Sequence, residues 1–366
     1  MSPQPIRVLI VDDSAVIRGL ISKSLEQEPE IIVAGTAMNG ERALSWMRAN
    51  PVDVVILDVE MPVMDGLTAL QRIQCDFPDV PVIMASGLTS QGAKTTVKAL
   101  SLGAVGCVAK PQTASAAESI RVLSRELVMM IKAVAGKRSS TTQAVTPSAS
   151  LRREAPAASP ASTPLFKRNI KFYKQPEVLV IGTSTGGPKA LAELMPQIPV
   201  DFPMPILIVQ HMPPGFTEIL ASHIQKDSGR ITVEAKHDQP LESNKTYVAP
   251  GGSHMLIGEK NGQKVTLINQ APPEHFCRPS VNPLFRTAAE HYGSATLAVM
   301  LTGMGEDGIE GSHEVARVGG TIIAQDEASS VVWGMPAAVV MAGLADKVLP
   351  LSEIAAEIKS HCLVRA

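Results

Sequence analysis

The chain has 366 residues, a formal net charge of −2 and a hydrophobic content of 45%. This length predicts two or three domains, and the hydrophobic content is too high for a disordered chain. The near-neutral charge argues against a nucleic-acid-binding surface along the whole chain, and no apolar run reaches the roughly 18 residues that a membrane helix needs. The N-terminus does not resemble a secretory signal, and the four cysteines lack the spacing of a metal site. We therefore expect a cytoplasmic protein with reduced thiols.

The first 135 residues alternate short aliphatic runs with amphipathic stretches. The runs are expected to be strands and lie at residues 8–11, 31–34, 54–57, 82–85 and 104–108. Strands that alternate with helices are typical of a doubly wound parallel sheet. We therefore predict an α/β domain over residues 1–135.

Polar side chains follow the ends of four of these predicted strands. Asp12 and Asp13 follow the first, Asp58 the third, Ser86 the fourth and Lys110 the fifth. The carboxyl ends of parallel strands meet at one edge of a sheet, and three crowded carboxylates there favour a hard cation such as Mg²⁺. Asp58 could then attack a phosphoryl donor, with Lys110 and Ser86 binding the phosphoryl oxygens. Alternatively, each aspartate only caps a following helix. Capping would be the better explanation for one such residue, but it does not explain five matched positions at the ends of four strands.

This pattern resembles the response-regulator receiver domain over residues 1–135. The matching segments are Val8-Leu-Ile-Val-Asp12-Asp13-Ser14, Ile56-Leu-Asp58-Val-Glu-Met-Pro62, Asp65-Gly66, Met84-Ala-Ser86 and Lys110-Pro111. The resemblance implies that Asp58 is the phosphoacceptor and that a histidine kinase is the phosphodonor. It also implies an Mg²⁺ site made by Asp13 and Asp58, with help from Asp12 and the backbone carbonyl of Glu60.

Two further features follow from the same resemblance. The peptide bond before Pro111 is expected to be cis, as in the family. The family often has Tyr or Phe where this chain has Cys107, which puts the aromatic part of the family's switch in doubt. Movement of Ser86 can still operate.

Residues 136–175 have a different composition, rich in Ser, Thr, Ala and Pro. They contain eight basic residues against the single acid Glu154 and show almost no periodicity. Such a segment is typical of a flexible linker, and its basic excess favours a solvated tether over a docking segment for an acidic partner.

Residues 176–366 resume the alternation of strands and helices. Strands are predicted at residues 178–181, 206–210, 246–249, 264–268, 297–301 and 321–323, and a first helix at about 188–195. We expect a second doubly wound, Rossmann-like parallel sheet. This block has 13 basic and 20 acidic residues, a net charge of −7.

Three residues in this block have the chemistry of a hydrolase triad, and each follows an apolar run. Ser184 lies in Gly182-Thr-Ser-Thr-Gly186, a pattern typical of a sharp strand-to-helix turn that exposes a nucleophile. His211 could take the serine proton, and Asp307 could orient the histidine. The chain order Ser, His, Asp differs from that of the α/β-hydrolase fold.

Other interpretations of these residues stay open at this point. The glycine-rich segment could be a phosphate loop, although Pro188 stands where that motif requires lysine. Ser184 could be a simple helix cap and Asp307 a turn residue. The histidines that compete with His211 are His237, His254 and His275.

Residues 178–360 resemble the catalytic domain of the chemotaxis methylesterase (CheB) family. The matching segments are Ile181-Gly-Thr-Ser-Thr-Gly-Gly-Pro188, Gln210-His-Met-Pro-Pro-Gly-Phe-Thr217, Ala249-Pro-Gly-Gly-Ser-His-Met255, Arg278-Pro-Ser-Val281 and Leu301-Thr-Gly-Met-Gly-Glu-Asp-Gly308. The resemblance implies that Ser184 is the nucleophile, His211 the base and Asp307 the orienting carboxylate. Thr185 and the backbone N–H of Met304 would support the triad or the oxyanion.

The implied substrate is the γ-glutamyl methyl ester on cytoplasmic helices of chemoreceptors, and the implied products are glutamate and methanol. Deamidation of specific receptor glutamines is a second activity of the family, and the sequence leaves open whether this chain has it. We expect no cofactor for the esterase, no nucleic-acid partner and no insertion into a membrane. We also expect the receiver to cover Ser184 until Asp58 is phosphorylated.

Two other function classes fit the sequence less well. A DNA-binding regulator requires a compact basic output domain, whereas this output block is acidic and rich in strands. A scaffold with an inactive esterase core is disfavoured because serine, histidine and aspartate are all present.

Overall fold

The computed structural model describes residues 4–87, 90–110, 123–125, 127–135 and 175–362. The predicted linker, apart from Gln175, and the predicted cis bond before Pro111 lie outside the described residues. No helix within those ranges is long and apolar enough to cross a membrane.

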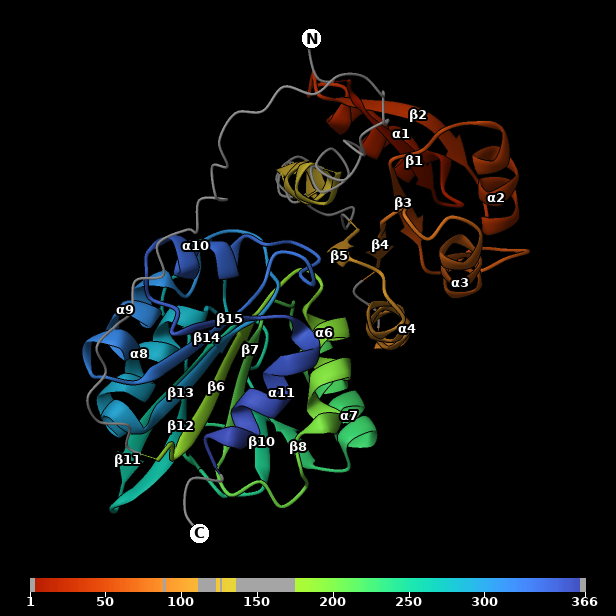
Figure 1. The fold of residues 1–366 in the computed structure, drawn as a ribbon. Helices are drawn as coiled ribbons and strands as arrows, with labels where there is room; N and C mark the ends of the chain where they lie inside the picture. The colour runs from red at the N-terminus through yellow and green to blue at the C-terminus, as the bar shows by residue number, and fades with distance from the viewer. Residues whose placement is uncertain (1–3, 88–89, 111–122, 126, 136–174, 363–366) are drawn as a thin grey trace, which may run out of the picture.

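The N-terminal sheet has five parallel strands in the order β2-β1-β3-β4-β5 (Figure 1). The strands are β1 (Ile6–Val11), β2 (Ile31–Ala37), β3 (Val54–Asp58), β4 (Val82–Ser86) and β5 (Gly106–Ala109). The helices are α1 (Ala15–Leu25), α2 (Gly40–Ala49), α3 (Gly66–Asp76) and α4 (Ser90–Ser101), and residues 123–125 and 127–135 are also helical. The predicted doubly wound sheet is confirmed.

Alternation along the buried strands gives this sheet two apolar faces. Val8 and Ile10 pack in one cluster with Leu25 of α1 and Leu127 of the last helix. Leu9 and Val11, which alternate with them along β1, pack in another cluster with α2, α3 and α4. Because successive side chains of a strand point to opposite faces, one continuous apolar run is enough to bury both sides.

The C-terminal sheet has seven parallel strands in the order β15-β14-β13-β6-β7-β10-β8. The strands are β6 (Val178–Thr183), β7 (Ile206–Gln210), β8 (Ile231–Glu234), β10 (Lys245–Val248), β13 (Thr296–Met300), β14 (Thr321–Gln325) and β15 (Lys347–Leu349). Helices α6 (Gly187–Leu194), α7 (Phe216–Ser228) and α11 (Leu351–Ser360) cover one face. Helices α8 (Val281–Tyr292), α9 (Ile309–Arg317) and α10 (Met335–Met341) cover the other face (Figure 1). The second parallel sheet is confirmed as well.

One predicted strand belongs to a different sheet. Residues 264–268 were expected in the parallel sheet but lie in β12 (Gln263–Asn269) of a small antiparallel sheet, order β11-β12-β9, with β11 (His254–Lys260) and β9 (Gln239–Pro240). The reason is a two-residue turn, Asn261-Gly262, in which φ is 53° and 76°. An Asn-Gly turn of this kind joins antiparallel strands and excludes a crossover helix. The prediction also missed β8, β9, β11 and β15, which lie outside the segments it had assigned to strands.

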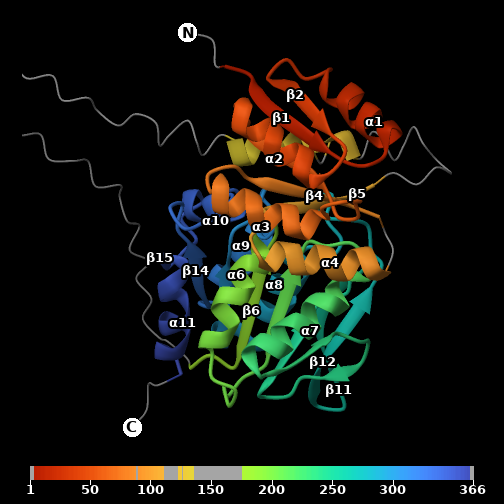
Figure 2. The same ribbon diagram turned by 90° about the vertical axis from the view of Figure 1, so that its right-hand side faces the viewer.

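The N-terminal and C-terminal parts of the fold are in contact through helices and loops. Helix α4 packs against α6 and α7, as Figure 2 shows from the side. The backbone N–H of Gly186 donates to the carbonyl of Val105 at 2.9 Å. Val332 of the C-terminal domain joins the apolar cluster of Leu127 and Met130. The N-terminal part of the fold therefore lies at the edge where the strands of the second sheet end.

Candidate active site

The ends of β6 and β7 bring Ser184 and His211 to the same edge of the sheet. Thr183 and Gln210 are register partners, so the next residue of each strand leaves the sheet at the same level. The His211 N–H donates to the Thr183 carbonyl at 3.2 Å. The Gln210 side-chain amide donates to the carbonyls of Ser184 at 2.9 Å and His211 at 3.1 Å. These bonds fix both backbones next to one another.

The turn after Ser184 requires glycine at two positions. Gly186 has φ of 80°, and a Cβ there would lie 2.5 Å from Cβ of Val331. A Cβ on Gly187 would lie 2.0 Å from the Gln210 side-chain oxygen. A larger residue at either position would displace these side chains, and the positive φ of Gly186 also favours glycine. Helix α6 begins at once, so the positive end of its dipole lies beside the serine.

Asp307 reaches the site from the loop after β13 and is buried at the N-terminus of α8. Its Oδ1 accepts from the Ser280 hydroxyl at 2.6 Å, and its Oδ2 accepts from the Val281 N–H at 2.7 Å. Burial alone would raise the pKa of this carboxyl, but the His211 contact and these hydrogen bonds keep the pKa below its ordinary value. Asp307 is therefore an anion surrounded by donors.

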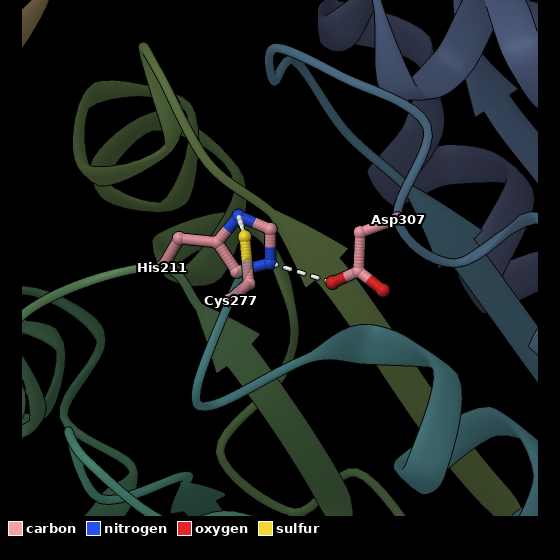
Figure 3. Close-up of side chains that lie close together, drawn as sticks. All are labelled: His211, Cys277 and Asp307. Atoms are coloured by element: carbon pink, nitrogen blue, oxygen red, sulfur yellow. Dashed lines mark hydrogen bonds and ion pairs between the residues drawn. The ribbon is translucent and has the colours of Figure 1, made fainter. Parts of the chain in front are cut away.

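His211 lies between this carboxylate and a cysteine (Figure 3). Its Nε2 is 2.7 Å from Asp307 Oδ2, and its Nδ1 is 3.5 Å from Sγ of Cys277. Burial lowers the pKa of the ring, but the hydrogen bonds to Asp307 and Cys277 outweigh burial and raise it above its ordinary value. In this setting the ring is a stronger base than free imidazole.

The structure joins two members of the predicted triad directly and brings the third to the same edge. Among the residues that the structure describes, no hydrogen bond joins the Ser184 hydroxyl to the His211 ring. Asp307 occupies Nε2, so the nitrogen left to accept the serine proton is Nδ1, which also faces Cys277. No local sequence pattern indicates Cys277, because it lies 66 positions from His211 along the chain.

The competing histidines have other partners. His237 is exposed and its Nδ1 lies 3.1 Å from the backbone of Ile268. His254 is buried between the Pro272 carbonyl and the Ser280 N–H. His275 lies 3.0 Å from the Glu310 carboxylate. None of these contacts involves Asp307.

The two expected support residues lie on the receiver side of the site. The Thr185 carbonyl accepts from the Thr302 hydroxyl at 2.9 Å, and its side-chain methyl lies toward Gly106 of the receiver. The Met304 side chain packs against the apolar cluster that contains Leu127. Of these two residues, Met304 can support the serine only through its backbone.

The acidic site of the receiver is centred on an ion-pair cluster. Lys110 Nζ lies 2.7 Å from Asp12 Oδ2 and 2.6 Å from Asp58 Oδ1. Burial raises the pKa of Asp58, and the contacts with Lys110 offset only part of that rise. Within the described ranges, no group donates to the buried Oδ2 of Asp58. A buried carboxylate oxygen that receives no hydrogen bond is available to bind a cation or to attack a phosphoryl group.

The carboxylates of this site could bind a cation that prefers oxygen ligands. Carboxylate oxygens of Asp12, Asp13 and Asp58 lie within 4.8 Å of one another, and such a donor set suits Mg²⁺. The Glu60 N–H donates to Asp58 Oδ1 at 3.4 Å. The Ser86 hydroxyl donates to the Gly87 carbonyl at 3.1 Å and so points to its own backbone in this conformation.

Comparison with known proteins identifies the families to which the two parts of the chain are similar. The family model for the CheB methylesterase matches residues 179–358, and the model for the response regulator receiver domain matches residues 8–120. A protein-glutamate methylesterase/protein-glutamine glutaminase of Azospirillum brasilense is 44% identical over 96% of this chain and 91% of its own length. One from Rhodospirillum rubrum is 44% identical over 96% of this chain and 94% of its own.

A solved structure agrees with the second sheet. The CheB methylesterase catalytic domain of Thermotoga maritima is 40% identical, covers 50% of this chain and 98% of its own, and has a TM-score of 0.50. The two family matches, their order along the chain and the 44% identity over 96% of the chain together show that this chain belongs to the family of protein-glutamate methylesterases that carry a response-regulator receiver.

Proposed function

We propose that this chain is a phosphorylation-regulated esterase that hydrolyses glutamate γ-methyl esters on the cytoplasmic helices of chemoreceptors, giving glutamate and methanol. The relatives' names supply the substrate class. The observation that supports the assignment most strongly is the 2.7 Å contact between His211 and Asp307 at the sheet edge where β6 ends in Ser184.

In the proposed reaction, the Ser184 hydroxyl attacks the ester carbonyl and its proton passes to Nδ1 of His211. The His211 Nε2–H donates to Asp307, which leaves the Nδ1 lone pair of the neutral ring free for that proton. The carboxylate then stabilises the imidazolium. Methanol leaves with the proton from His211, and water hydrolyses the acyl-enzyme by the same route.

The developing oxyanion would lie near the start of α6. The dipole of this helix favours negative charge there. We assign supporting roles to Thr185 and to the backbone N–H of Met304, on the family resemblance.

The same site would also deamidate receptor glutamines. A glutamine side chain differs from the methyl ester in its leaving group, so the same acyl-enzyme forms with loss of ammonia in place of methanol. The relatives are named for both reactions.

We assign residues 1–135 to the receiver, 136–175 to the linker and 176–366 to the esterase. In the receiver, a histidine kinase would donate the phosphoryl group to Asp58, with Ser86 and Lys110 binding its oxygens. Asp12, Asp13, Asp58 and the backbone carbonyl of Glu60 would bind Mg²⁺, which when present neutralises charge on the phosphoryl group. The buried, unpartnered Oδ2 of Asp58 supports this assignment.

Inhibition by the unphosphorylated receiver would act through its contacts beside the nucleophile. Gly186, two residues after Ser184, donates to Val105 of the receiver at 2.9 Å. The Arg125 guanidinium lies 4.3 Å from the centre of the ring of Phe276, the residue that precedes Cys277 in the sequence. A tenfold activation requires a change of only about 1.4 kcal/mol in the stability of these contacts.

The test is methanol release from a methylated receptor, measured with and without a small phosphodonor. Ser184→Ala should abolish release, and His211→Ala should be far slower than His237→Ala, which removes an exposed histidine. The isolated 176–366 fragment should exceed the resting full chain in rate. Near-native turnover by Ser184→Ala would reject the triad, and a fragment as slow as the resting chain would reject inhibition by covering.

A further inference from the structure

The contact between His211 and Cys277 brings together a donor set that the esterase reaction does not require. An imidazole nitrogen, a thiol sulfur and a carboxylate oxygen, from His211, Cys277 and Asp307, all lie within 4.8 Å of one another. Imidazole and thiolate are the preferred ligands of Zn²⁺. The receiver site, by contrast, is built around the carboxylates of Asp12, Asp13 and Asp58.

The distance between the nitrogen and the sulfur suits a tetrahedral zinc ion. Zinc binds sulfur at about 2.3 Å and nitrogen at about 2.0–2.1 Å, so tetrahedral angles place the two ligand atoms about 3.5–3.6 Å apart. His211 Nδ1 and Cys277 Sγ are 3.5 Å apart. Figure 3 shows Sγ over the face of the ring, whereas the Nδ1 lone pair lies in the ring plane, so one ion binds both atoms after the Cys277 side chain turns toward that plane.

Asp307 completes the arrangement from the other side of the ring. Its carboxylate accepts from Nε2 at 2.7 Å, which leaves Nδ1 without a proton in the neutral ring. A histidine that binds zinc through one nitrogen commonly donates the other N–H to a carboxylate, and this partner orients the ring and increases its basicity. The pair that serves the esterase thus also prepares Nδ1 for a metal.

The loop that carries Cys277 is held in place by its own hydrogen bonds. Cys277 and Glu274 exchange backbone bonds of 2.8 and 3.2 Å. The Glu274 carboxylate is bound by both terminal nitrogens of Arg286, at 2.6 and 2.8 Å. The sulfur is partly exposed. The backbone that carries the ligand is therefore supported, and an ion can reach the sulfur.

We propose that His211 Nδ1 and Cys277 Sγ bind Zn²⁺, with Asp307 orienting the ring, and that the ion inhibits the esterase reversibly. Zinc occupies the lone pair that must accept the Ser184 proton, so the inhibitory part of this inference rests on the proposed function. Binding releases the thiol proton to solvent and changes no oxidation state. With two protein ligands, the other positions are left to water, and binding is weaker than at a structural zinc site.

The experiment compares the full chain with two variants, Cys277→Ser and the control Cys75→Ser, which removes an exposed thiol in α3 of the receiver. Methanol release is titrated with zinc chloride, and each rate is divided by that variant's own zinc-free rate. The wild type and Cys75→Ser should lose activity and recover it with a chelator. Cys277→Ser should need at least tenfold more zinc. Equal sensitivity of Cys277→Ser would overturn the site.

A second readout does not depend on esterase activity. Cobalt(II) added to the same proteins should give a thiolate-to-cobalt charge-transfer band in wild type and Cys75→Ser, and none in Cys277→Ser. A band without methanol release would retain the metal site and reject the proposed function. Methanol release without a band that depends on Cys277 would reject the metal site alone.

Discussion

Replacing Asp307 with asparagine preserves the shape of the side chain and removes its charge. Oδ2 accepts from His211 and from the Val281 N–H, each at 2.7 Å, and Oδ1 accepts from the Ser280 hydroxyl at 2.6 Å. Both oxygens face donors, so the NH₂ group of asparagine must also face a donor. When NH₂ lies toward His211, the ring moves its proton from Nε2 to Nδ1 and loses the lone pair for Ser184.

The structure allows both losses to be estimated. The charged hydrogen bonds are worth about 1.5–3 kcal/mol and the interaction with the start of α8 about 0.3–1 kcal/mol, so the free energy of unfolding should fall by about 2–4 kcal/mol. The wrong tautomer lowers kcat by about 10⁴ in serine proteases, which is about 5.4 kcal/mol in the barrier. The variant should therefore stay folded and be almost inactive.

The assay is methanol release by Asp307→Asn, with thermal unfolding followed by circular dichroism to measure the folded fraction. The control is Glu310→Gln, which removes a neighbouring charge that accepts from Asn282 at 2.6 Å and does not contact His211. The control should retain its rate within about threefold, since surface substitutions of this kind usually cost under about 0.5 kcal/mol. A folded Asp307→Asn within tenfold of wild type, or a Glu310→Gln equally slow, would refute the orienting role.

Three further predictions concern the nucleophile, the switch and the contact between domains. Ser184→Ala should lower kcat by up to about 10⁶ while the melting temperature stays near that of wild type; retention of a tenth of the activity would contradict this. Asp58→Asn should leave the resting rate unchanged and abolish stimulation by a small phosphodonor, so persistent stimulation would place the phosphoacceptor elsewhere. His223 lines a cavity of about 370 Å³ with Lys98 of the receiver. Burial first, and then Lys226 and Lys98, lower its pKa below the ordinary 6.5 despite the opposing charge of Asp227. When the two domains separate, His223 therefore binds a proton more readily. The contact between the domains should weaken as the pH falls through about 6.5. The rate of the full chain divided by that of the 176–366 fragment should rise over this range, and should be flat in His223→Gln; an equal rise in that variant would exclude His223.

The sequence determined the parallel architecture because buried parallel strands appear as uninterrupted aliphatic runs. The runs at 8–11, 54–57 and 206–210 coincide with β1, β3 and β7 to within two residues at either end. Polar residues directly after such runs must leave the sheet at its carboxyl edge. This local rule is enough to nominate Asp58, His211 and Ser184 from the sequence.

The antiparallel sheet shows where that rule stops. A run such as 264–268 predicts a strand but does not specify its partner. The partner was decided by the Asn261-Gly262 turn, whose positive φ values join β12 to β11. Strand existence depends on local periodicity, whereas strand pairing depends on the geometry of the connection.

Only the tertiary structure decided the chemical surroundings of His211. Its motif predicted a base at the end of β7, but the choice of Nε2 for Asp307 and the approach of Cys277 to Nδ1 depend on loops 66 and 96 residues away. The same holds for the contact of Val105 with Gly186. A residue's place along a strand is a property of its neighbours in sequence, but the partners of its side chain are set by the packing of distant segments.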